Sequence, residues 1–281
     1  TTLRGDIQGI YDLSKYVKGL SIRASGAYKL VEANNQSTVY KIQYYDWVGT
    51  MTGNRNAPGS MSQYNKRWEN INLGGFVNYE NTFAGLHRVS AMAGMTAEQE
   101  TYKGLSASRN KGPLYADSGL EDLNVFVTGD NNGAAGGRNS WGLVSYLTRL
   151  SYTYDDRYSV ELLGRRDGSS KLSDSQRWKN FYSVSGYWRP LRENFMKDIS
   201  WISELKLRYN YGKTGSVEGI GNYERYATIS TGTALFGTTP NMQSTMWLGS
   251  MTSDQRTWET IDSHDFGIDF GFLNNRLNGS F

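Results

Sequence analysis

The sequence predicts an all-β fold, an antiparallel transmembrane β-barrel of which about ten strands are present. Three observations support this fold class. Apolar and polar residues alternate through most of the chain, short and long connections follow one another in turn, and aromatic residues make up 14% of the chain. A membrane barrel explains all three, because its outer face meets lipid, its inner face meets water and aromatic girdles mark both interfaces.

The alternation predicts the individual strands, since a period of two places one apolar and one polar face on a strand. It is clearest in SIRASGAYK (21–29), NINLGGFVNYE (70–80), YSVELLGRRDG (158–168), LKLRYNY (205–211) and DFGIDFGF (265–272). In the fourth of these, Leu205, Leu207, Tyr209 and Tyr211 are expected to face lipid. The complete set of expected strands is 3–13, 20–30, 66–80, 88–100, 139–154, 158–168, 177–189, 204–214, 258–272 and 277 onward.

The connections between these strands favour a membrane barrel over a soluble sheet, which also has one polar face. The short connections are 14–19, 84–87, 155–157, 190–203 (with room for one helical turn) and 273–276. The long or polar ones are 31–65, 102–138, 169–176 and 215–257. Short periplasmic turns and long extracellular loops have this distribution. Because the chain starts and stops inside strands, residues 1–281 are expected to be one partial barrel domain of a wider barrel.

The composition excludes several classes of protein. With 38% hydrophobic residues and a mean hydropathy of −0.60, no segment approaches the roughly 20 apolar residues that a membrane helix needs. A net charge of +3 with no basic run argues against nucleic acid as a partner. The chain has no cysteine. This absence fits an exported protein built without disulfides, but cytosolic proteins can lack cysteine as well. The first residues lack the apolar core of a signal peptide, so a removed leader or a start inside a longer protein is expected.

No motif predicts an enzyme, a metal site or a cofactor site. Gly212-Lys213-Thr214 lacks the earlier glycine of a phosphate-binding loop, and residues 130–133 lack the oxygen spacing of a calcium loop. His87 and His264 are far apart in the sequence, and without cysteine they give no local metal-ligand spacing. Glu161, Arg165 and Asp167 fall on one strand face and are interpreted as an ionic network on a barrel wall.

Aromatic residues in the long loops are the candidate ligand-binding residues. Sugar rings stack on aromatic faces through their C–H patches, while polar neighbours bind the hydroxyl groups. The alternative is that these side chains pack the loops against each other or against a partner protein. The candidates are Tyr44, Tyr45, Trp47, Tyr115 and Trp247, with Phe126 and Phe236 in the same loops.

Several stretches resemble the SusC/RagA family of TonB-dependent outer-membrane transporters of Bacteroidota. The resemblance is most specific in GRNSWGLVSYLTRLSYTYDDRYSVELLGRRDGSSKL (137–172), NFMKDISWISELKLRYNYGKTGS (194–216) and WETIDSHDFGIDFGFLNNRLNGSF (258–281). The chain departs from the family at Tyr182, where proline is common, and at Pro190, where an aliphatic residue is usual. The resemblance implies a complete barrel of about 22 strands. The family's N-terminal extension, TonB box and plug domain are not among these residues.

The resemblance implies a function and partners. A Gram-negative outer membrane would hold the protein, which would import a large nutrient, most often an oligosaccharide, with a SusD-like surface lipoprotein and energy from the TonB complex. Two alternatives stay open: a passive or adhesive barrel that displays surface loops, and a peptide importer. A hydrolase is disfavoured, because the two distant histidines provide no nucleophile–base pair.

Overall fold

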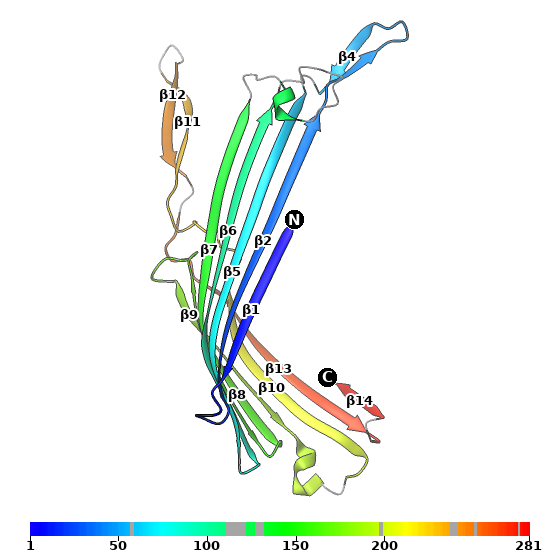
Figure 1. The fold of residues 1–281 in the computed structure, drawn as a ribbon, viewed down its shortest axis with the longest axis vertical. Coiled ribbons are helices and arrows are strands. Elements are labelled where there is room, and N and C mark those ends of the chain that lie inside the picture. The colour runs from blue at the N-terminus through cyan, green and yellow to red at the C-terminus, as the bar shows by residue number, and fades with distance from the viewer. Residues whose placement is uncertain are drawn as a thin grey trace. The chain divides into compact units, whose positions relative to one another are not determined.

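The computed structural model describes residues 1–281 except 57–58, 111–121, 127–131, 197–198, 237–240, 250–251 and 275. Its main element is a sheet of ten strands, which lie side by side in the order in which they occur along the chain (Figure 1). Within the described residues, two further sheets have two strands each and are hairpins within the connections. Among the residues that the structure describes, no helix is long and apolar enough to cross a membrane.

The ten strands of the large sheet occur at the ten places where the sequence predicts them. Their order in the sheet is β1-β2-β5-β6-β7-β8-β9-β10-β13-β14. The bounds are Thr2–Asp12 (β1), Leu20–Val39 (β2), Ser60–Phe83 (β5), His87–Arg109 (β6), Gly133–Tyr154 (β7), Tyr158–Ser169 (β8), Trp178–Trp188 (β9), Ile202–Ser216 (β10), Glu259–Phe272 (β13) and Leu277–Ser280 (β14).

Strands β2, β5, β6 and β7 extend well beyond the predicted ranges, mainly at the ends that adjoin the long connections. β5 also gains three residues at its other end, and β10 gains two at each end. Toward the long connections the apolar alternation fades, but backbone pairing does not require an apolar face. Polar pairs across β2 and β5 continue the ladder: Asn65 donates to Asn34 at 2.5 Å, and Gln63 donates to Gln36 at 3.1 Å. The predicted loops 31–65 and 102–138 are therefore partly strand.

The chain divides into two compact units. The first comprises Thr1–Asp6, Ala27–Ile71 and Gln99–Ser140, and the second comprises Ile7–Gly26, Asn72–Glu98 and Trp141–Phe281.

In the second unit, one face of the sheet is apolar from β7 to β13. Directly paired residues of neighbouring antiparallel strands share a face, so the strand register gives its rows. The row Leu150, Leu162, Val184, Tyr211, His264 is followed by the row Tyr152, Val160, Gly186, Tyr209, Phe266. Leu205 pairs with Phe270 and Leu207 with Ile268 on this same face, as the sequence predicts. We call it the apolar face.

The apolar face includes the earlier strands of the second unit. On β6, the His87 ring nitrogen lies 2.8 Å from the Tyr152 hydroxyl of β7. On β2, a Cβ at Gly26 would lie 3.5 Å from Leu73 of β5 and 3.8 Å from Ile7 of β1. On the opposite face, the Arg23 guanidinium stacks over the Phe76 ring at 4.6 Å. Each strand therefore has one apolar and one polar side, as a half-buried strand must.

Tight turns close the hairpins at the predicted short connections. Ala84, Asp155 and Asp156 have φ of 51°, 46° and 54°, and Leu273 and Asn274 have φ of 53° and 57°. Positive φ at both central residues is the signature of the two-residue hairpin turn whose twist matches that of its strands. The predicted helical turn in 190–203 is present as two short 3-10 helices, η2 (Pro190–Arg192) and η3 (Asn194–Met196).

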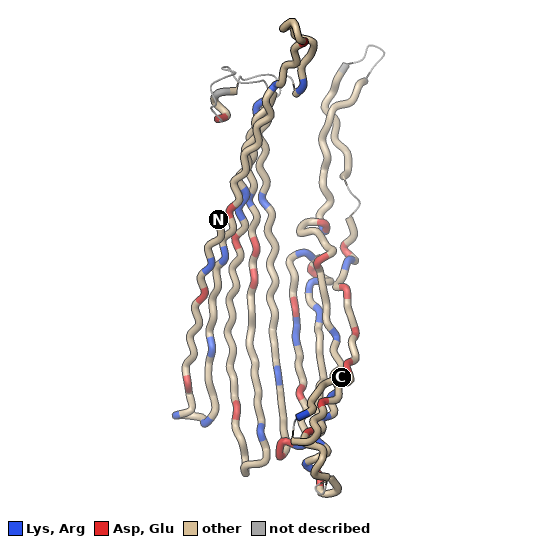
Figure 2. The backbone as a smooth tube through the Cα atoms, turned by 90° about the vertical axis from the view of Figure 1, so that its right-hand side faces the viewer, with Lys and Arg blue, Asp and Glu red and all other residues tan. Residues whose placement is uncertain are grey.

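Three long connections contain secondary structure of their own. The connection after β2 forms the hairpin β3 (Ile42–Tyr45) and β4 (Met51–Arg55), and the one after β10 forms β11 (Ile229–Phe236) and β12 (Asn241–Leu248). The short 3-10 helix η1 (Leu123–Val125) lies after β6. Residues 229–248 include no Lys, Arg, Asp or Glu, so the described part of this hairpin is uniformly tan in Figure 2.

Candidate functional site

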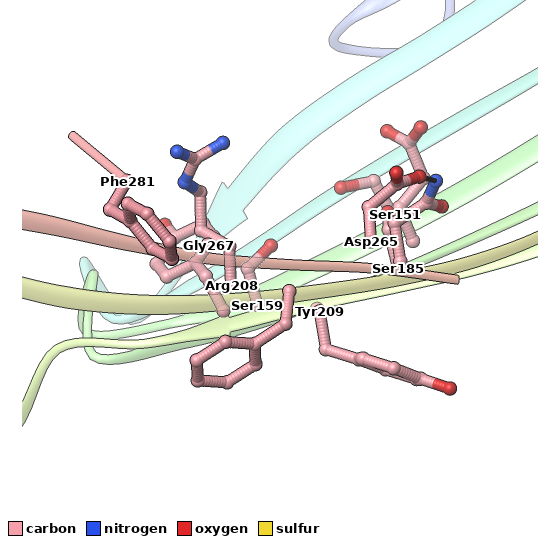
Figure 3. Close-up of a pocket in the computed structure, with 13 residues that line it drawn as sticks. Ser151, Ser159, Ser185, Arg208, Tyr209, Asp265, Gly267 and Phe281 are labelled. Carbon is pink, nitrogen blue, oxygen red and sulfur yellow. Dashed lines mark hydrogen bonds between the residues drawn. The ribbon is translucent and has the colours of Figure 1, made fainter. Parts of the chain in front are cut away.

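The face opposite the apolar face holds the main polar site of the second unit. A polar row crosses five strands, from Ser151 through Glu161, Ser185 and Asn210 to Asp265. These residues line an open cavity of about 500 Å³. Figure 3 shows the Arg208 and Asp265 side chains on one side of the sheet and the Tyr209 side chain on the other.

Ion pairs and hydrogen bonds orient the side chains on this polar face. Arg208 Nη2 donates to Asp269 Oδ1 at 2.7 Å, and Lys206 Nζ lies 4.0 Å from the other oxygen of the same carboxylate. Asn210 Nδ2 donates to Asp265 Oδ2 at 3.1 Å. Gly267 has a specific role, because a Cβ there would lie 3.0 Å from the Arg208 guanidinium carbon. The pairs are half-exposed, so they position side chains more than they stabilise the fold.

Of the ionic network predicted on β8, the contact between Arg165 and Asp167 is confirmed. Arg165 Nε donates to Asp167 Oδ1 at 2.6 Å, and Arg165 Nη2 donates to Ser145 Oγ at 3.1 Å. The Asp167 side chain is only 6% exposed, so the bond from Arg165 pairs a nearly buried carboxylate with a cation. Glu161 pairs instead with Arg149 of β7, at 3.9 Å.

An apolar cluster joins the loop ends of the strands in the second unit. Trp258 and Phe181 are each 5% exposed, and their ring centroids are 5.4 Å apart in an edge-to-face arrangement. Leu172 of the β8–β9 connection is fully buried beside them. Trp258 stands at the predicted start of a strand, but it precedes β13 and packs here. We call this the rim cluster: Leu143, Leu172, Phe181, Val217, Ile220 and Trp258.

Hydrogen bonds around the rim cluster connect the β8–β9 and β10–β13 loops. Lys171 Nζ donates to the Val217 carbonyl at 3.3 Å, and Arg225 Nη1 donates to the Leu172 carbonyl at 2.8 Å. Ser173 donates to the Asp254 carbonyl at 2.7 Å. These two loops are therefore packed together at the base of the β11–β12 hairpin. The sequence did not predict this loop packing, because the residues that make it are scattered along the chain.

The structure places four of the five candidate aromatic residues on hairpins and leaves them accessible. Tyr44 and Tyr45 end β3, and Trp47 lies in the β3–β4 turn with 95% of its surface exposed. The Asp46 carboxylate holds this turn by accepting from the backbone N–H of Val48 at 3.0 Å and of residue 50 at 2.7 Å. Trp247 of β12 is half-exposed.

The structure does not bring the candidate aromatic residues together in one site. Tyr44, Tyr45 and Trp47 belong to the first unit and Trp247 to the second. Tyr115 lies outside the described residues. Phe126 is buried, and the Arg109 side chain donates to its backbone carbonyl at 3.0 Å, so its ring is not accessible to a ligand in this structure.

The two histidines lie on the apolar face beside tyrosines. His87 lies near Tyr152, and the His264 ring nitrogen lies 2.9 Å from the Tyr209 hydroxyl. Among the described residues, no group of three or more His, Cys, Asp or Glu is arranged to hold a metal ion.

Comparison with known proteins relates this arrangement to outer-membrane receptors. The chain is 31% identical over 208 residues to TonB-dependent receptor P39 of Formosa agariphila, a match that covers 73% of this chain and 19% of the relative. It is 36% identical over 140 residues to TonB-dependent receptor SusC of Bacteroides thetaiotaomicron, covering 49% of this chain and 14% of that receptor. The chain thus spans about a fifth or less of the length of these relatives. No protein-family profile matches the sequence.

The solved structures agree in fold. The RagAB peptide importer in its closed-closed state superposes with a TM-score of 0.81 at 21% sequence identity, over 99% of this chain and 29% of that chain. At this identity the likeness concerns the fold, which is a partial antiparallel β-barrel. Sequence and structure together identify the chain as a SusC/RagA-like part of a TonB-dependent receptor.

Proposed function

We propose that the chain forms part of the wall of a larger outer-membrane barrel that takes up a nutrient with energy from TonB. The observation that carries this proposal is the two-faced sheet. Leu162 and Val184 lie on the apolar face, suited to lipid, while Glu161 and Ser185 lie on the polar face, suited to a water-filled lumen. The named relatives are TonB-dependent receptors, which supports TonB as the source of energy.

An oligosaccharide is the cargo that the loops favour. The accessible Trp47 side chain and the half-exposed Trp247 offer aromatic faces to sugar rings, on connections that we place outside the cell. The likeness to the RagAB peptide importer favours a peptide as the second candidate. In either case a SusD-like lipoprotein is the proposed partner at the loop side of the barrel. We propose no catalytic activity for the chain.

Uptake by the full-length receptor in its own cells tests this function. We expect uptake of a labelled oligosaccharide to stop when TonB is deleted, because work is needed to release a tightly bound ligand into the periplasm. Uptake that continues unchanged without TonB would contradict the proposal. A labelled peptide pool, used in parallel, separates the two cargo classes.

Tryptophan variants in the same assay test the loop aromatics. Replacing both Trp47 and Trp247 by alanine should weaken apparent ligand affinity about tenfold, because stacking contacts are lost. The matched control is Tyr16→Ala, an exposed aromatic residue in the β1–β2 turn. It should leave uptake unchanged. Equal effects of the two changes would show that the loop tryptophans do not contact the ligand.

A further inference from the structure

On three neighbouring strands, β2, β5 and β6, the side that carries the apolar face becomes charged at corresponding positions. Along β5 it runs through Val77, Leu73 and Ile71, and it then reaches Glu69 and Arg67. On β2 the corresponding side of the strand is uncharged from residue 22 to residue 30, and its first charge is Glu32. On β6 it is uncharged from residue 89 to residue 101, and its first charge is Lys103.

These first charges contact one another. Arg67 Nη2 lies 2.6 Å from Glu69 Oε1, and Arg67 Nε lies 3.8 Å from Glu32 Oε1. Lys103 Nζ lies 4.0 Å from the second Glu69 oxygen. Two cations and two carboxylates balance, so this cluster has no net charge. In a membrane barrel, such a band of charges marks the level where hydrocarbon gives way to the polar interface.

Directly beyond the ion pairs, the same side of β2 and β5 presents carboxamides. The pairs are Glu32 with Arg67, then Asn34 with Asn65, then Gln36 with Gln63, at successive alternate positions. We call the last four residues the amide ladder. A carboxamide has two N–H donors and an oxygen that can accept twice, so the single bond within the Asn34–Asn65 pair uses only part of its capacity.

An open cavity of about 530 Å³ lies against the amide ladder. Its lining includes Asn34, Gln63 and Asn65, together with Leu105 and Ala107 of β6. The Leu105 side chain is 64% exposed and provides an apolar patch beside the amides. Donors and acceptors next to an apolar patch suit a sugar ring, whose hydroxyls lie around its edge and whose C–H groups form its face.

From this placement we propose that the amide ladder binds the sugar headgroup of a glycolipid in the outer leaflet of the membrane. This inference rests on the membrane location proposed above. The site lies on the side of the strands that carries the apolar face, so cargo passing through the lumen does not reach it. Because Arg67 and Lys103 are already paired with carboxylates, the site recognises neutral sugar rather than phosphate.

Retention of glycolipid by the purified full-length receptor tests this proposal. The probe is glycolipid extracted from the producing cells, and native mass spectrometry counts the molecules retained in detergent. The variant combines Asn34→Leu with Asn65→Leu. We expect it to retain at least about fivefold less glycolipid, since hydrogen bonds to the headgroup are lost. The matched control, Asn72→Leu with Asn78→Leu, changes two amides on the polar side of β5 and should retain the wild-type amount.

Three results would overturn the proposal. Equal retention by the ladder variant and the control would show that the amides do not hold a lipid. Retention that falls steeply with added salt in the wild type would indicate phosphate binding through Arg67 and Lys103. A ladder variant that retains glycolipid but loses affinity for the soluble nutrient oligosaccharide would make the site a cargo site. TonB-dependent uptake is measured separately, so failure of the proposed function is distinguishable from failure of this inference.

Discussion

Replacing Val184 by arginine is expected to destabilise the folded receptor by about 2–4 kcal/mol, the cost of a cation on the lipid side of a barrel near the middle of the membrane. Val184 pairs with Leu162 on one side and Tyr211 on the other, and both partners lie on the apolar face. The only polar group that its direct partners offer is the Tyr211 hydroxyl, which already donates to Asp262 at 3.2 Å. The measurement is urea unfolding of the receptor in phospholipid vesicles, followed by the loss of the compact form on gels.

Ser185→Arg is the matched control, because it places the same side chain at the next residue of β9 but on the polar face. Its paired neighbour on β8 is Glu161, so the new charge gains a partner. We expect a change of less than about 1 kcal/mol, as for a solvated ion pair. Equal destabilisation by the two variants would show that the faces are assigned wrongly.

Replacing Trp258 by alanine is expected to have the largest effect on the loops, because removing a buried tryptophan costs about 3–5 kcal/mol. The change removes the ring contact with Phe181 and the hydrogen bond from Trp258 Nε1 to the Arg177 carbonyl, which is 3.0 Å long. The loops 170–177 and 217–258 should then open locally, while the strands stay paired. Limited proteolysis of intact cells should cut these loops faster in the variant.

The control for this variant is Trp247→Ala in the same β10–β13 connection. Trp247 is half-exposed on β12 and does not belong to the rim cluster. Its removal should leave the proteolysis rate unchanged. If Trp258→Ala also leaves the rate unchanged, the rim cluster does not hold these loops.

The sequence predicted the ten strands and the short turns because both depend on local patterns. Alternation of apolar and polar residues assigns the faces of β10 and β13 correctly, as the pairing of Leu207 with Ile268 shows. The two-residue turn at Asp155 and Asp156 is likewise a local feature, set by the backbone conformation of two residues.

Features that depend on long-range contacts could not be predicted in the same way. Nothing near Trp258 in the sequence indicates that it packs against Phe181, a residue of another strand. The extension of β2 past residue 30 depends on polar pairs with β5 rather than on apolar alternation. The loop aromatics were recognised by composition, and the structure shows Trp47 on a hairpin turn, but their contact with a ligand stays a prediction.

Cysteine labelling of the full-length receptor in intact cells tests the central claim, a membrane-spanning wall with its hairpin loops outside, most directly. Residues 1–281 contain no cysteine. Any cysteine elsewhere in the receptor is replaced first, so that each substitution carries the only reactive thiol. Val48→Cys in the β3–β4 turn should react with a membrane-impermeant maleimide in intact cells. Tyr16→Cys in the β1–β2 turn should react only after the outer membrane is permeabilised. Both residues are exposed, so burial does not explain a difference. If Tyr16→Cys but not Val48→Cys reacts in intact cells, the assignment of the two ends of the wall is wrong. If both react in intact cells, the wall does not span the membrane.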